Sequence, residues 1–80
     1  MTAQEIEPIL IQGISAIKNL DPSEVAPFKS FHEMGVDSLG FVEILVFIEK
    51  TFKIQLIASE LTKDDFENVH RLALLISRQQ

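Results

Sequence analysis

Apolar residues recur at helical spacing in the first part of the chain, so that they share one face of a helix. They are Ile6, Ile9, Leu10, Ile14 and Ile17. Thr2 and Glu5 stand at the spacing of a capping box, which marks a helix start. Pro8 conflicts with this start, because a proline beyond the first turn clashes with the carbonyl group four residues earlier. The pattern predicts a first helix that begins at Thr2 or, if Pro8 sets its limit, near Glu7.

The first helix is expected to end at Asp21-Pro22-Ser23, and no sustained periodicity follows until Val36. A connection of this length is unusual in a small domain and is commonly either functional or disordered. Several apolar side chains could anchor it in the core, namely Val25, Phe28, Phe31 and Met34. We therefore expect a long, ordered and functional loop.

The second helix is predicted over residues 38–52, with Asp37 as its N-cap. One of its faces can close a small core and carries Phe41, Ile44, Leu45, Ile48 and Phe52. The opposite face carries an apolar strip with charged neighbours, formed by Leu39, Val42 and Val46 beside Glu43, Glu49 and Lys50. Either this strip needs a partner or the helix is buried on most sides, and periodicity does not separate the two.

Two more helices follow in the pattern. Thr62 and Asp65 could cap a short third helix within residues 58–66. Asn68 can cap a final helix whose apolar face comprises Val69, Leu72, Ala73 and Ile76. The predicted fold is all-α, a four-helix bundle with a long loop between the first two helices, in a single domain over residues 1–80.

Composition narrows the function. The 80 residues contain no cysteine, which excludes disulfides, thiolate metal sites and cysteine nucleophiles. Twelve acidic against seven basic side chains give a net charge of −5, which disfavours nucleic acid and favours basic partners. No apolar run approaches membrane-spanning length and no signal-peptide pattern opens the sequence, so we expect a cytoplasmic protein without membrane insertion.

Residues 31–54 resemble the phosphopantetheine attachment region of acyl carrier proteins. The matching positions are an aromatic residue, a Met, a Gly, an Asp-Ser-Leu triplet, an acidic residue and a terminal Phe, which are Phe31, Met34, Gly35, Asp37, Ser38, Leu39, Glu43 and Phe52. The resemblance covers the whole chain, and Asn68-Val69 stands where carrier proteins commonly have Thr-Val. It is the full set of positions, rather than Asp-Ser-Leu alone, that carries the assignment.

The resemblance implies that Ser38, flanked by Asp37 and Leu39, receives 4′-phosphopantetheine from coenzyme A through a separate, magnesium-dependent phosphopantetheinyl transferase. The thiol of that group would carry acyl intermediates of fatty acid, polyketide or related biosynthesis as thioesters, and the chain itself would be a monomer without catalysis or a metal. Acyl-loading and acyl-processing enzymes with basic patches would dock on Leu39, Val42, Glu43, Val46 and Glu49. From the residues alone, Ser38 could also be an ordinary capping or first-turn serine, although a helix start does favour a phosphodiester.

No catalytic set is visible, because neither His32 nor His70 can be tied to Ser38 as a general base. We expect His32 to lie on the surface of the loop.

Some residues depart from the family pattern and bear on cargo and partner choice. Gly40 replaces a residue that is often polar or acidic, Lys50 interrupts an acidic pair, and Phe47 is larger than usual. With Phe41 and Phe52, Phe47 crowds the second helix, which favours a short or polar cargo.

Residues 61–68 resemble the third-helix region of D-alanyl carrier proteins and related stand-alone carriers. The alternatives are therefore an aminoacyl carrier, of D-alanyl or peptidyl type, and a helical interaction module that carries no cargo. A helix-turn-helix DNA reader is disfavoured, because the second helix presents Leu, Val and Glu rather than base-reading side chains.

Overall fold

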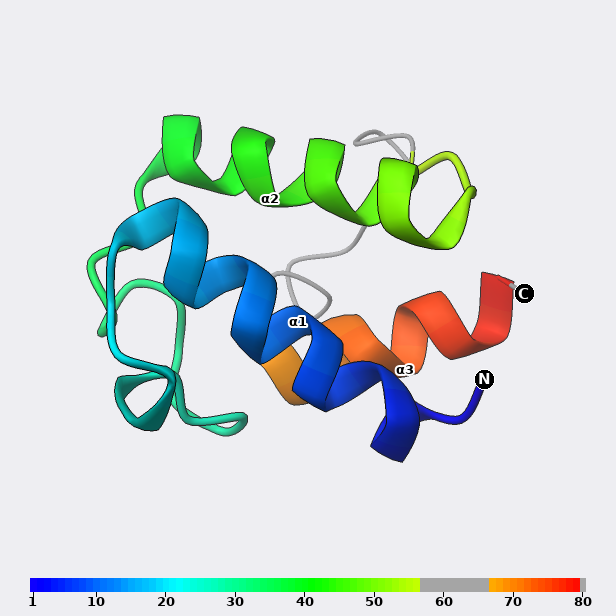
Figure 1. Cartoon of the computed structure of the whole chain (residues 1–80), viewed down its shortest axis with the longest axis horizontal. Helices are drawn as coiled ribbons and strands as arrows, with labels where there is room; N and C mark the ends of the chain where they lie inside the picture. Colours follow the sequence, from blue (N-terminus) through cyan, green and yellow to red (C-terminus); the bar gives the residue numbers. More distant parts are fainter. Residues whose placement is uncertain (57–66, 80) are drawn as a thin grey trace.

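The computed structural model describes residues 1–56 and 67–79 (Figure 1). Within them lie three α-helices, α1 (Ala3–Lys18), α2 (Ser38–Phe52) and α3 (Val69–Gln79), and one 3-10 turn, η1 (Pro22–Glu24). The all-α prediction is confirmed for this part of the chain, and the helix predicted at residues 58–66 lies outside it. The helix α1 packs against both α2 and α3. The core therefore lies where these three helices meet (Figure 1).

Helix α1 begins with the predicted capping box. The Thr2 hydroxyl accepts from the Glu5 amide at 3.2 Å, and the Thr2 amide donates to the Glu5 carboxylate at 2.9 Å. This second hydrogen bond lowers the pKa of Glu5 below its usual value. The alternative start near Glu7 is wrong, and Pro8 lies inside the helix. The amide that Pro8 lacks would have bonded the carbonyl of Gln4, and Gln4 is exposed, so water can solvate that carbonyl.

The first helix ends at Lys18, earlier than the proline pattern predicted. Asn19 takes a left-handed conformation with φ 55°, and the Leu20 amide donates to the Ser15 carbonyl at 2.8 Å, as in a helix C-cap. The Asp21-Pro22-Ser23 motif instead opens η1. The backbone amide of Ser23 donates to the Asp21 carboxylate at 2.9 Å and lowers the pKa of Asp21.

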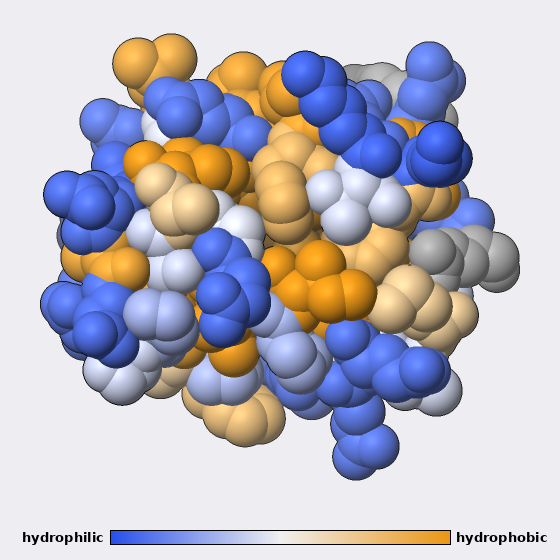
Figure 2. Space-filling model, in the orientation of Figure 1, coloured by the Kyte–Doolittle hydropathy of each residue, from blue (hydrophilic) through white to orange (hydrophobic). Residues whose placement is uncertain are grey.

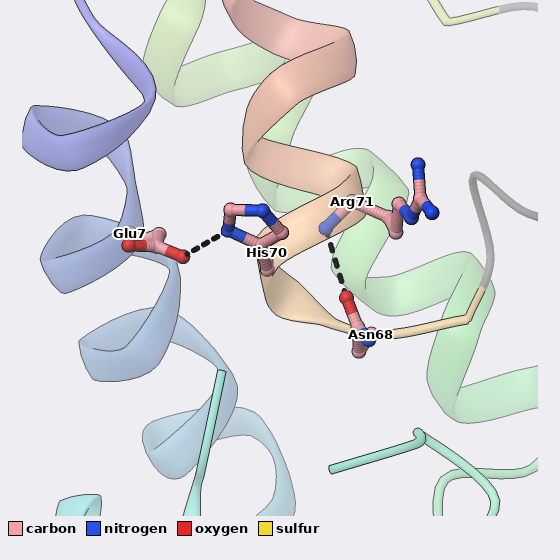
Figure 3. Close-up of polar contacts among 4 residues, drawn as sticks. All are labelled: Glu7, Asn68, His70 and Arg71. Atoms are coloured by element: carbon pink, nitrogen blue, oxygen red, sulfur yellow. Dashed lines mark hydrogen bonds and ion pairs between the residues drawn. The ribbon is translucent and has the colours of Figure 1, made fainter. Parts of the chain in front are cut away.

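The predicted apolar faces form the core. On α2, Ile44, Ile48 and Phe52 are buried, and Phe41 and Leu45 pack partly buried against the same cluster. The predicted face of α3 is buried throughout, and Leu75 joins it. Asn68 caps α3 as predicted, because its side-chain oxygen accepts from the Arg71 amide at 2.8 Å (Figure 3).

The loop before α2 is anchored as predicted, with one exception. Val25, Phe31 and Met34 are buried, and the Phe31 ring meets Phe41 of α2 edge to face at 5.4 Å. Phe28 is 73 % exposed, so its predicted place in the core is wrong. Its ring lies instead against the ring of His70, with centroids 4.7 Å apart.

Backbone hydrogen bonds hold this loop against the start of α3. The amide of Phe31 donates to the Glu67 carbonyl at 3.0 Å, and the amide of His70 donates to the Pro27 carbonyl at 3.0 Å. Gly35 then turns the chain with φ 79°, a left-handed conformation that a residue with a Cβ rarely adopts. This turn directs the end of the loop toward Asp37, the residue that precedes α2.

A hydrogen bond joins α1 to α3. His70 Nδ1 lies 3.0 Å from Glu7 Oε1, and both side chains are partly exposed (Figure 3). His70 therefore contacts α1 through Glu7 and the loop through Phe28 and Pro27. His70 thus has a structural role, because it links α3 to both α1 and the loop.

Candidate functional site

Ser38 is the first residue of α2 and is exposed, while the neighbouring Asp37 caps the helix. Asp37 Oδ1 accepts from the Gly40 amide at 2.8 Å, and the Asp37 carbonyl accepts from the Phe41 amide at 2.9 Å. The Ser38 hydroxyl has no hydrogen-bond partner among the described residues. The capping role that a serine often takes at a helix start thus belongs to Asp37, and the hydroxyl of Ser38 is available for reaction.

The start of α2 also offers donors for an anion. Within residues 1–56 and 67–79, the backbone amides of Ser38 and Leu39 donate to no protein acceptor, as is usual in the first turn of a helix. The positive end of the helix dipole adds to their attraction for negative charge. The arrangement can therefore accommodate a phosphodiester beside the hydroxyl.

The apolar strip on α2 faces outward. Leu39 is 70 % exposed, Val42 53 % and Val46 43 %. Glu43 is exposed beside them and Glu49 is half-buried. The alternative in which α2 is buried on most sides is wrong for this face, which carries an apolar surface with acidic neighbours next to Ser38.

No described hydrogen bond joins either histidine to Ser38. His32 is exposed on the loop, as predicted, and His70 is engaged with Glu7 and Phe28. In the part of the chain that the structure describes, no group of three or more acidic, His or Cys side chains could hold a metal ion.

A second feature of the site involves Lys18, which the sequence pattern did not connect to Ser38. Gly40 is buried, and a Cβ there would lie 3.2 Å from Asp37 Oδ1 and 3.4 Å from Lys18 Nζ. Lys18 thus reaches across from the end of α1 to the first turn of α2. The only sequence signal was a glycine in the first turn of a helix, which costs stability unless something packs closely on it.

Phe47 lies at the edge of the core face, where it meets α1. Its ring packs on Gly13, so closely that a Cβ on Gly13 would stand 2.3 Å from Phe47 Cζ. Beside this contact an open groove of about 530 Å³ is lined by Pro8, Ile9, Gln12, Gly13, Phe47 and Thr51. Figure 2 shows apolar residues across the middle of this face, with hydrophilic residues around them.

The described helices include none that is long and apolar enough to cross a membrane.

Comparisons with known proteins point to one family. The family described as "Phosphopantetheine attachment site" matches residues 9–76. D-alanyl carrier proteins of Streptococcus pyogenes serotypes M5 (strain Manfredo), M49 (strain NZ131) and M1 are each 34 % identical to this chain over 67 residues, which is 84 % of this chain and 85 % of each relative.

The helical fold and the match over most of the chain define a small carrier protein. The chain belongs to the phosphopantetheine-binding carrier protein family. Its cofactor is covalently attached 4′-phosphopantetheine, and its partners include a phosphopantetheinyl transferase and further enzymes. Members of this family carry cargo and are not themselves catalysts. The exposed hydroxyl and free amides at the start of α2 fit the phosphodiester of such a group.

Proposed function

We propose that this protein is an aminoacyl carrier of the D-alanyl type, with 4′-phosphopantetheine attached to Ser38. The observation that carries the attachment is the exposed Ser38 hydroxyl at a helix start where Asp37 already serves as the cap. The cargo is inferred from the D-alanyl carrier proteins of S. pyogenes, which match most of this chain. These relatives favour the aminoacyl alternative over fatty acid or polyketide synthesis. The ring of Phe47 lies against Gly13 beside an open groove, so crowding by Phe47 adds no support for a small cargo.

Attachment requires one substitution at phosphorus. The Ser38 oxygen bonds to the phosphorus of the pantetheine phosphate in coenzyme A, and the nucleotide half of coenzyme A leaves. The hydroxyl proton passes to a base of the transferase, because the two histidines of this chain are engaged elsewhere or lie on the loop. The amides of Ser38 and Leu39 and the helix dipole stabilise the resulting phosphodiester. Once bound, the cofactor supplies the thiol that holds the cargo as a thioester.

Docking of partner enzymes is assigned to the outer face of α2. Leu39, Val42 and Val46 supply apolar contact next to the attachment site. Glu43 and Glu49 supply negative charge that attracts basic patches and sets orientation. Leu39 and Asp37 flank the modified residue, so a transferase that binds Ser38 must contact both.

The attachment is tested by mass spectrometry after incubation with coenzyme A and a phosphopantetheinyl transferase. We expect one added phosphopantetheine on Ser38, and none on a Ser38→Ala variant that keeps its fold. Ser23→Ala is the matched control, because Ser23 is also exposed but lies on η1. Modification of the Ser38→Ala variant, or of another residue in the wild type, would refute the assignment.

The cargo is tested on the modified protein in two parallel reactions. One contains D-alanine, ATP and a D-alanine-activating ligase, and the other contains malonyl-coenzyme A and a malonyl transferase. We expect a D-alanyl thioester in the first reaction and no loading in the second. Malonyl loading alone would leave the carrier role intact and would show that the aminoacyl assignment is wrong.

A further inference from the structure

Lys18 lies against the first turn of α2, although it belongs to the end of α1. A Cβ on Gly40 would stand 3.4 Å from Lys18 Nζ and 3.5 Å from Lys18 Cδ, so the side chain lies along the glycine. The same Cβ would stand 3.2 Å from Asp37 Oδ1. The ammonium and the capping carboxylate therefore both lie beside Gly40, without a hydrogen bond or ion pair between them. Lys18 is partly buried there and not extended into solvent.

With respect to α2 alone, this position is unfavourable for a cation, although Lys18 also lies in the last turn of α1, whose negative dipole end favours it. The start of a helix carries the positive end of its dipole, which attracts anions and repels ammonium groups. Asp37 offsets part of that repulsion through its negative charge. A second anion would make this position more favourable for the Lys18 ammonium group. The phosphodiester expected on Ser38 would be that anion.

We propose that Lys18 is a positioning cation for the modified start of α2. This inference rests on the assignment of Ser38 as the attachment residue. Modification places a phosphodiester on the residue next to the Asp37 carboxylate, and the two anions repel each other. Lys18 reduces this repulsion from the side of Asp37, so that both the cap and the phosphodiester can remain at the helix start.

Lys50 provides a matched control. It is an exposed lysine of the same helix, and it lies in the last turn of α2. Twelve residues of helix separate it from Ser38, which is roughly 18 Å along the axis. This exceeds the screening length of about 8 Å at physiological ionic strength. Lys18→Met and Lys50→Met thus remove the same charge, one beside the site and one far from it.

The test compares melting temperatures of the unmodified and phosphopantetheinylated forms of the wild type, Lys18→Met and Lys50→Met. We expect modification to lower the melting temperature of Lys18→Met by roughly 2–4 °C more than that of the wild type. Lys50→Met should respond to modification as the wild type does. The extra loss should vanish near 1 M salt, where screening is strong. Equal responses of the two lysine variants would overturn the proposal.

A second arm needs no transferase and separates this inference from the attachment itself. Ser38→Glu places a carboxylate at the same position, and it is combined with Lys18→Met in a double-mutant cycle. We expect Ser38→Glu to be more destabilising without Lys18 than with it. Additive effects of Ser38→Glu and Lys18→Met would overturn the role of Lys18. Absence of phosphopantetheine on wild-type Ser38 would refute only the attachment.

Discussion

Replacement of Gly13 by alanine should destabilise the protein, although the same change stabilises most helices. Gly13 lies in the middle of α1, where alanine is ordinarily favoured by about 1 kcal/mol. Here the added Cβ would stand 2.3 Å from Phe47 Cζ, 2.4 Å from Cε1 and 2.9 Å from Cδ1. Carbon atoms in good contact lie about 3.5–4.0 Å apart, so the whole ring must move by more than about 1 Å.

The cost of that movement exceeds the gain in helix propensity. Overpacking of this kind costs about 1–3 kcal/mol, because the ring of Phe47 loses its contact with α1 or α1 shifts away from α2. We expect a net loss of about 1 kcal/mol in the free energy of unfolding, and hence a melting temperature about 4–8 °C lower. Thermal and urea denaturation followed by circular dichroism measure both quantities.

The sign of the effect should reverse when the ring is removed. In a Phe47→Ala background, Gly13→Ala meets no ring and should raise the free energy of unfolding by about 1 kcal/mol. Phe47→Val serves the same purpose if Phe47→Ala is too unstable for a clear transition. A stabilising effect of Gly13→Ala that is equal in both backgrounds would show that the Gly13–Phe47 contact does not limit the approach of α1 and α2.

Two further predictions concern charge. Glu43→Lys and Glu49→Lys should slow modification by the transferase several-fold and weaken its salt dependence, whereas Glu67→Lys, outside α2, should not; initial rates at two salt concentrations decide this. Because the pKa values of Glu5 and Asp21 are lowered in the folded protein, the stability they contribute is present above the usual carboxyl range and is lost as the pH falls through their folded pKa values. The melting temperature of the wild type should therefore exceed that of the Glu5→Gln, Asp21→Asn double variant at pH 7 and approach it at pH 3. A constant difference between the two proteins over this pH range would contradict this account.

The features predicted correctly from the sequence depend on neighbours along the chain. Asp37 and Asn68 cap helices by accepting hydrogen bonds from amides three residues later, and such contacts can be recognised without knowledge of the fold. The bounds of α2 follow from the Asp37 cap and from the helical spacing of the apolar residues after it. The exposure of Ser38 follows from the same local geometry, since Asp37 takes the capping position.

The wrong predictions concern residues whose local pattern permits two outcomes. Pro8 can end a helix or be tolerated within one, and the exposed carbonyl four residues earlier decided for tolerance. Phe28 has the apolar character of a core residue, yet its position on the loop places it against His70 rather than inside. Access of solvent to a backbone carbonyl decided the case of Pro8, and a ring from another element decided the case of Phe28.

The sequence by itself determined the helical class, the three N-terminal caps and the apolar faces, because these arise from residues within one or two turns of each other. The contact of Phe47 with Gly13, the hydrogen bond of Glu7 with His70 and the approach of Lys18 to Gly40 were decided only by tertiary structure. Each of these pairs joins residues on different helices. Their meeting depends on how closely and at which angle the helices pack, and that is set by the whole core at once.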